Sequence, residues 1–162
     1  MARFILPALA IVLILMSVPN TAQAQNAVQL SVFDPIQLVK NTDNVNGIRL
    51  NLIYTKNANV SGLDLGFIYN YTTGNEVGFQ SALVSKVDGH LTGVQWSMVS
   101  LVGGKMTGWQ SGAYNSASQM SGLQLGFVNT CESAYGLQLG LVNIIEKGGF
   151  MPFFPFFNFP FK

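Results

Sequence analysis

A tandem repeat of about 15 residues dominates the sequence and limits the folds that it can adopt. The clearest copies are GLQLGFVN from Gly122 and GLQLGLVN from Gly136. Earlier units in the same frame begin at Gly47, Gly62, Gly78, Gly93 and Gly108. From Gly47 to Gly136, the successive leading glycines are 15, 16, 15, 15, 14 and 14 residues apart. A degenerate copy begins at Ala27, and Pro152–Asn158 reads as a worn final copy, which makes about nine units. Such a fixed period is typical of repeat architectures.

Within each unit, bulky and small or polar residues alternate with the period of a β-strand. The unit that begins at Gly122 places Leu123, Leu125 and Phe127 on one face, and Gln124 among small residues on the other. The residues between units are rich in Asn, Thr, Ser and Gly, as turns are. Each unit is therefore predicted to form one strand of about eight to ten residues and a short polar connection.

The small-residue face carries a long polar side chain at the same place in each unit. This predicted structural polar ladder consists of Gln29, Arg49, Asp64, Gln80, Gln95, Gln110, Gln124 and Gln138. Arg49 and Asp64 are neighbours in the ladder, and we expect them to form a structural ion pair, since a charge in a confined space needs a partner.

Two all-β architectures fit these units. In the first, strands joined by hairpins form an antiparallel meander that closes into a small β-barrel, with the Gln face towards a narrow lumen and the Leu/Phe face towards lipid. In the second, each unit of about 15 residues is one coil of a β-solenoid with parallel strands, in which Leu and Phe fill the interior and the Gly/Gln face lies outside. The recurrence of Asn115, Asn129 and Asn143 favours stacked coils, whereas strand length and interior volume favour the barrel. We take the barrel as the first expectation and the solenoid as the alternative.

Residues 1–24 are predicted to be a cleavable signal peptide. Arg3 supplies the positive charge, an apolar stretch follows, and Ala22-Gln23-Ala24 matches a cleavage site. An uncleaved membrane anchor is the other reading, but the apolar run is short for a spanning helix. The predicted organisation is completed by a β-repeat domain at residues 25–149 and a C-terminal segment at residues 150–162.

The C-terminal segment, FMPFFPFFNFPFK, contains seven phenylalanines in thirteen residues. Left exposed, they would form a large apolar patch, so we expect them to contact the domain, lipid or a partner. We interpret the segment as a closing strand or cap over an open sheet edge. The alternative is a recognition signal for barrel insertion.

The composition and motifs favour a protein without enzymatic activity. Charged residues make up 9% of the chain and the net charge is +1, so the basic patch required for nucleic-acid binding is missing. His90 is the sole histidine and Cys131 the sole cysteine, which leaves no triad and no metal-ligand cluster. We therefore predict no catalytic, cofactor-binding or metal-binding residues.

After the predicted signal peptide, the chain begins with a segment that contains VQLSVFDPIQLV. It continues with GIRLNLIY and GLDLGFIYN and ends with a segment that contains MPFFPFFNF. In these segments it resembles a poorly characterised family of bacterial surface-repeat proteins built on tandem GLQLGLVN-like units. The resemblance covers essentially all of the chain after the signal peptide and implies an envelope or surface location, without an activity.

Together these features predict an exported protein of the outer membrane or cell surface, with lipid of the outer membrane as its partner and a structural or surface-interaction role. The alternative is a periplasmic or secreted β-solenoid binding module that uses either the Gln/Gly face or the Leu/Phe face for contact.

Overall fold

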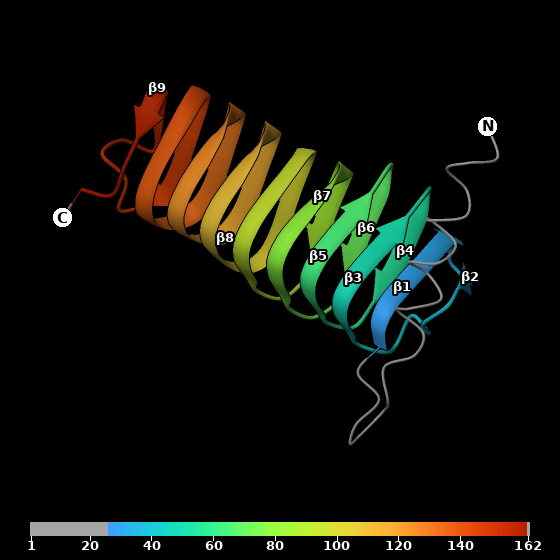
Figure 1. The fold of residues 1–162 in the computed structure, drawn as a ribbon. Coiled ribbons are helices and arrows are strands. Elements are labelled where there is room, and N and C mark those ends of the chain that lie inside the picture. The colour runs from blue at the N-terminus through green and yellow to red at the C-terminus, as the bar shows by residue number, and fades with distance from the viewer. Residues whose placement is uncertain (1–25, 162) are drawn as a thin grey trace.

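The computed structural model describes residues 26–161, and these residues form strands and connections without a helix (Figure 1). The strands are β1 (Asn26–Phe33), β2 (Ile36–Gln37), β3 (Val45–Asn51), β4 (Tyr54–Asn57), β5 (Val60–Gly66), β6 (Tyr69–Thr72), β7 (Glu76–Val87), β8 (Leu91–Lys147) and β9 (Phe153–Asn158). The predicted signal peptide, residues 1–24, lies outside the described residues.

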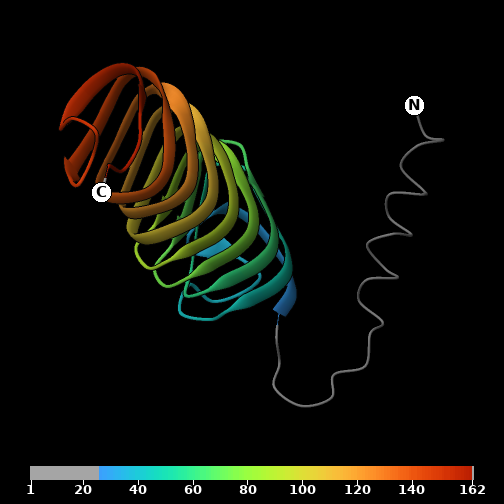
Figure 2. The same cartoon turned by 90° about the vertical axis from the view of Figure 1, so that its left-hand side faces the viewer.

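The repeats stack as the coils of a β-solenoid, so the first expectation of an antiparallel barrel is wrong and the alternative holds. Strand β3 pairs with β5, β5 with β7, and β7 with β8, all in parallel. The register advances by one repeat, so that Arg49 lies beside Asp64 and Gln80 beside Gln95. Strand β8 runs for 57 residues because it winds through several turns without a break (Figures 1 and 2).

Each turn contributes to two parallel sheets. The first sheet contains β1, β3, β5 and the start of β7, and the second contains β4, β6 and the end of β7. Residues predicted to be polar hairpin connections, such as Asn70 and Thr72, lie in β6 and are buried. Each turn is therefore completed by a second strand, which pairs in parallel with its neighbours, and not by a hairpin. For this reason no antiparallel meander forms.

The leading glycine of each unit permits the close stacking of turns. Gly62 has a φ of +126°, a backbone conformation that residues other than glycine rarely adopt. A methyl group at Gly62 would overlap the carbonyl oxygen of Gly47. The same relation links Gly78 to Gly62 and Gly93 to Gly78. The glycine that defines the repeat in the sequence is thus a residue at which any side chain would meet the backbone of the preceding turn.

The interior of the described residues contains two apolar clusters and a larger polar part. The larger cluster occupies one corner of the later turns and consists of Val87, Leu91, Val102, Met106, Ala117, Met120, Cys131, Ala134 and Ile145. A smaller cluster of Val39, Val45 and Val60 lies in the first turns. Most other fully buried side chains are amides, hydroxyls or charged groups.

The C-terminal segment covers the last turn of the solenoid. Strand β9 pairs antiparallel with the end of β8, with Leu139 opposite Phe157 and Gln138 opposite Asn158. The ring of Phe150 stacks on Phe159 at a centroid distance of 5.5 Å. The segment therefore occupies the sheet edge that the final turn would otherwise expose.

Candidate functional site

All eight residues of the polar ladder lie inside the solenoid and are fully buried. From Gln95 onwards, each glutamine donates a hydrogen bond from Nε2 to Oε1 of the glutamine one turn earlier, at 2.7–2.8 Å. The second hydrogen of Nε2 reaches a carbonyl of the opposite sheet, as from Gln110 to Ser116 at 3.2 Å. The ladder therefore ties successive turns together and also links the two sheets, which satisfies amides that would be costly to bury alone.

The row of glutamines from Gln138 to Gln80 ends at an acidic residue of the ladder, Asp64. Nε2 of Gln80 donates to Oδ2 of Asp64 at 2.8 Å, so every donor in the row points towards the N-terminal turns. Arg49 binds the same carboxylate with two hydrogen bonds, Nε to Oδ1 at 2.7 Å and Nη2 to Oδ2 at 2.6 Å. The bidentate ion pair thus balances the charge of Asp64 on one side, while the aligned amides stabilise it on the other.

Glu76 adds a second buried carboxylate to this pair. Its Oε2 accepts a hydrogen bond from Thr72 at 2.7 Å and lies 3.8 Å from Nη2 of Arg49. Burial, reinforced by the negative charge of Asp64, raises the pKa of Glu76 to about 8, although Arg49 and the Thr72 hydrogen bond act in the opposite direction. The raised pKa favours the neutral form of Glu76 beside the Arg49–Asp64 ion pair.

A second amide ladder runs along the opposite sheet in the reverse sense. Nδ2 of Asn115 donates to Oδ1 of Asn129 at 2.9 Å, and Nδ2 of Asn129 donates to Oδ1 of Asn143 at 2.8 Å. These donors point towards the C-terminal end, whereas those of the glutamines point towards the N-terminal end. The two rows of amide dipoles therefore oppose each other.

The outer surface of the first sheet and the corner that follows it form an extended apolar face. We call this the apolar face; its residues, four from each turn, are Val28, Leu30, Val32, Phe33, Ile48, Leu50, Leu52, Ile53, Leu63, Leu65, Phe67, Ile68, Phe79, Ser81, Leu83, Val84, Val94, Trp96, Met98, Val99, Trp109, Ser111, Ala113, Tyr114, Leu123, Leu125, Phe127, Val128, Leu137, Leu139, Leu141 and Val142. None is charged. Several are strongly exposed, among them Phe67 at 74% and Phe127 at 64%.

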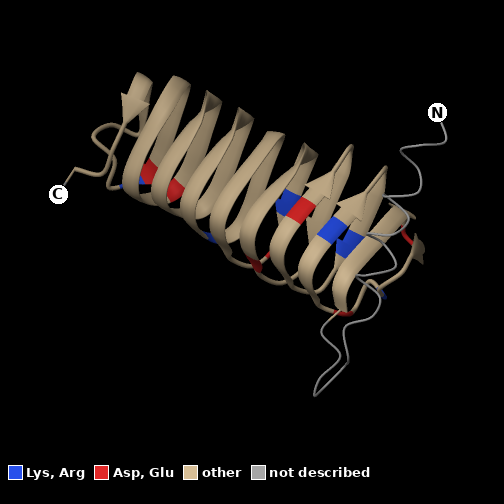
Figure 3. Ribbon diagram, in the orientation of Figure 1, with Lys and Arg blue, Asp and Glu red and all other residues tan. Residues whose placement is uncertain are grey.

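The charged residues of the described chain lie outside the apolar face. They are few, as the sparse coloured segments of the ribbon show (Figure 3). Examples are the exposed ion pair of Lys86 and Asp88 at 3.0 Å and that of Lys147 and Glu132 at 3.6 Å. Contiguous apolar surface of this extent is rare on a monomeric soluble protein and marks a contact surface. The apolar face is therefore the candidate functional site.

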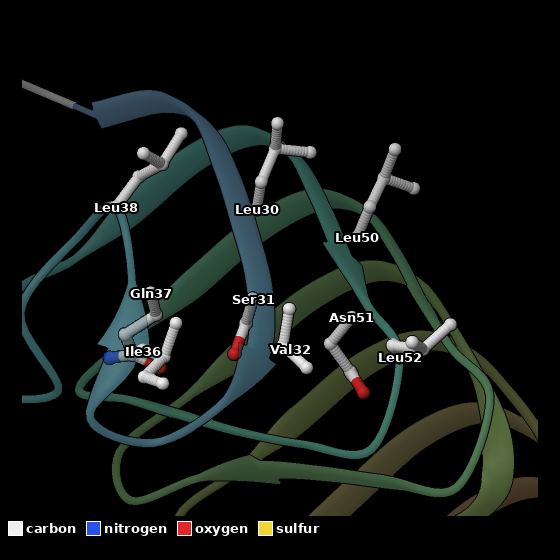
Figure 4. A pocket seen from close by; sticks show the side chains of 9 residues that line it. All are labelled: Leu30, Ser31, Val32, Ile36, Gln37, Leu38, Leu50, Asn51 and Leu52. Atoms are coloured by element: carbon white, nitrogen blue, oxygen red, sulfur yellow. The ribbon is translucent and has the colours of Figure 1, made fainter.

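Three hollows lie along the apolar face. At the N-terminal end, Leu30, Leu38 and Leu50 point to one side of the ribbon and border a hollow of about 470 Å³ (Figure 4). A second hollow, of about 330 Å³, lies over Ser111 between Trp96 and Trp109. The third, of about 470 Å³, lies beside Trp96 and Met98. It is also bordered by Ser81, Ala82, Ser97, Gly112, Ala113 and Phe127.

The described residues contain no cluster of three or more His, Cys, Asp or Glu side chains that could hold a metal ion. His90 has a structural role at a corner of the coil, where its Nδ1 accepts a hydrogen bond from the backbone of Lys105 at 2.8 Å. Asn75 does the same for the backbone of His90 at 2.8 Å. Cys131 is buried, and its burial raises the pKa of the thiol to about 12.

Sequence reasoning grouped the ladder residues and the charged pair that the structure brings together. It missed Glu76, because a charged residue directly after Gly74 and Asn75 has the pattern of a solvated turn, although the side chain is buried. The register of the repeat could have identified it, since Glu76 stands two residues before Gly78, as Leu91 does before Gly93.

Comparison of the chain with protein-family models, curated proteins and solved structures gives no match. Within residues 26–161, no helix has the length and apolar character needed to cross a bilayer.

Proposed function

We propose that the protein is an exported, non-enzymatic component of the bacterial cell envelope that acts by contact through the apolar face. The observation that carries this proposal is a broad outer surface without a charged residue, held on a rigid solenoid. The Gln/Gly face cannot serve as the contact surface because its polar side chains are buried and paired with one another.

Two features of the sequence support the location. Residues 1–24 have the pattern of a secretory signal, and the units resemble those of bacterial surface-repeat proteins. A free thiol that is buried and a domain stabilised by hydrogen bonds are both compatible with an extracytoplasmic environment, where a disulfide is an option and not a requirement.

The proposal is tested by expressing the full chain in a Gram-negative bacterium and analysing its processing and its complexes. We expect mass spectrometry to find a mature N-terminus at Gln25, in the envelope or periplasmic fraction. We expect crosslinking in intact cells to give face-dependent products that the variant Phe67→Ser, Phe127→Ser, Leu141→Ser loses. A control variant, Lys105→Ser, alters an exposed residue outside the apolar face and should keep them.

An unprocessed, cytoplasmic chain would contradict the location. Identical crosslinking of the triple variant and the wild type would contradict the role of the apolar face.

A further inference from the structure

The centre of the apolar face consists of a ridge beside a groove. Trp96 and Met98 protrude from one turn and are 63% and 59% exposed. The next turn carries Ser111 and Ala113 at the equivalent places, and the preceding turn carries Ser81 opposite Trp96. Hollows of about 330 and 470 Å³ flank the ridge as a consequence.

We propose that the apolar face is the interface of a homodimer, in which Trp96 of each copy enters the hollow over Ser111 of the other. This inference rests on the proposed function and names the partner of the same face. A two-fold axis parallel to the strands, between the turns of Trp96 and Ser111, brings the ridge of one copy onto the groove of the other. Both contacts then form twice, as an isologous interface requires.

The same axis matches large side chains with small ones in the two turns beside it. It places Met98 opposite Ala113, and Ser81 opposite Leu125, because each position in a turn faces the same position in the turn related by the axis. It also places Val94 opposite Trp109. In these two turns each large side chain therefore meets a smaller one, whereas one turn further out Leu83 faces Phe127 and the copies meet through two large apolar side chains.

The ends of the apolar face agree with this arrangement independently. Counted from the axis, the turn of Leu50 lies opposite the C-terminal strand β9, in which Phe157 continues the outward position of Leu139. Leu50 lines the N-terminal hollow of about 470 Å³, and Phe157 is an exposed aromatic side chain. The dimer therefore brings an aromatic residue of one copy over an apolar hollow of the other.

The size and the charge of the apolar face suit a second copy. With turns about 4.8 Å apart and residues about 3.3 Å apart, the face from Ile48 to Leu137, continued by β9, extends about 34 Å along the solenoid and about 17 Å across it. The projected area is about 580 Å², and because protruding side chains expose more area than they project, the face approaches the roughly 800 Å² per partner of a stable interface. It lacks the basic side chains that draw proteins to anionic lipid.

The test is an exchange of ridge and hollow in the purified mature chain, residues 25–162. Analytical ultracentrifugation without detergent should find a dimer for the wild type. Trp96→Ser removes the ridge and Ser111→Trp fills the hollow, and each should weaken the dimer at least about ten-fold, as loss of a central anchor does. The double variant W96S/S111W moves the ridge by one turn and restores the match, so its affinity should return towards that of the wild type.

The control is Thr107→Trp, which adds an indole at an exposed position outside the apolar face and should leave the dimer unchanged. Circular dichroism of every variant should show the wild-type spectrum, because all three sites point to solvent in a single copy. A monomeric wild type, or a double variant as weak as the two single ones, would overturn the dimer. Binding of monomers to phosphatidylcholine vesicles through the apolar face would also overturn it, while leaving the proposed function intact.

Discussion

The buried carboxylate of Glu76 makes a defined prediction about the dependence of stability on pH. In the unfolded chain a glutamate titrates near its ordinary pKa of 4.5, whereas burial raises the pKa in the folded protein to about 8. The folded protein therefore keeps a proton that the unfolded chain releases between these values. Stability is fully present below about pH 4.5 and falls as the pH rises through 8.

The magnitude follows from the difference between the two pKa values. A difference of about 3.5 units at about 1.4 kcal/mol per unit gives a loss of the order of 5 kcal/mol between pH 4.5 and pH 9. The substitution Glu76→Gln removes the ionisable group and keeps its size and a hydrogen-bond acceptor for Thr72. The variant should therefore lose little stability over this range and should exceed the wild type at pH 9.

The assay is urea unfolding at pH 5, 7 and 9, at one protein concentration, followed by tryptophan fluorescence. Glu132→Gln serves as the matched control because it neutralises an exposed carboxylate, and its midpoints should follow those of the wild type. The reasoning is refuted if the wild type is as stable at pH 9 as at pH 5, or if Glu76→Gln loses stability as steeply as the wild type.

Three further outcomes follow from the stacking of the turns. Gly93→Ala should lower the free energy of unfolding by more than about 2 kcal/mol, because φ is +133° and the new methyl group meets the backbone of the preceding turn. The control Gly148→Ala, with no atom near the added methyl group, should cost only about 1 kcal/mol, and equal urea midpoints for the two variants would contradict this. Gln95→Leu leaves two buried ladder partners unpaired and should cost about 2–5 kcal/mol in urea unfolding, whereas the exposed Gln119→Leu should have no effect of that size. The thiol of Cys131 should resist iodoacetamide at pH 8 until urea unfolds the chain, since its raised pKa and burial suppress the thiolate; rapid alkylation of the folded protein would speak against that environment.

The sequence was sufficient to predict the period, the strands and the division of each unit into two faces. It did not predict the direction of the return path, because buried and exposed polar residues look alike in a sequence. Asn70 and Thr72 resemble turn residues, yet they lie in a second parallel sheet and hydrogen-bond across the interior. Their polarity reflects partners inside the protein and not contact with water.

The orientation of the faces combined the two expectations in an unexpected way. The solenoid was expected to fill its interior with Leu and Phe, and the barrel was expected to enclose the Gln face. The structure has the coils of the first and the enclosed glutamines of the second. A thin coil accommodates one extended amide per turn among glycines, and stacking supplies each amide with a partner at the next turn.

Ser81 and Ser111 illustrate a further limit of sequence reasoning. On the lipid face of a barrel they would be exceptions to an apolar pattern. On the solenoid they lie on either side of Trp96 and create the hollows that give the apolar face its shape. Their meaning depends on which turns are neighbours, and the sequence alone left that open between two architectures.

The glutamine row also limits how the interior can rearrange. Each amide presents its oxygen to one neighbour and its nitrogen to the other, so turning a single side chain over would set oxygen against oxygen on one side and nitrogen against nitrogen on the other. The row can therefore reverse only as a whole, and the carboxylate of Asp64, which accepts but does not donate, fixes its sense. Replacement of Asp64 by asparagine, which can both accept and donate, would release that constraint as far as Gln138, at the far end of the row, without any movement of the backbone.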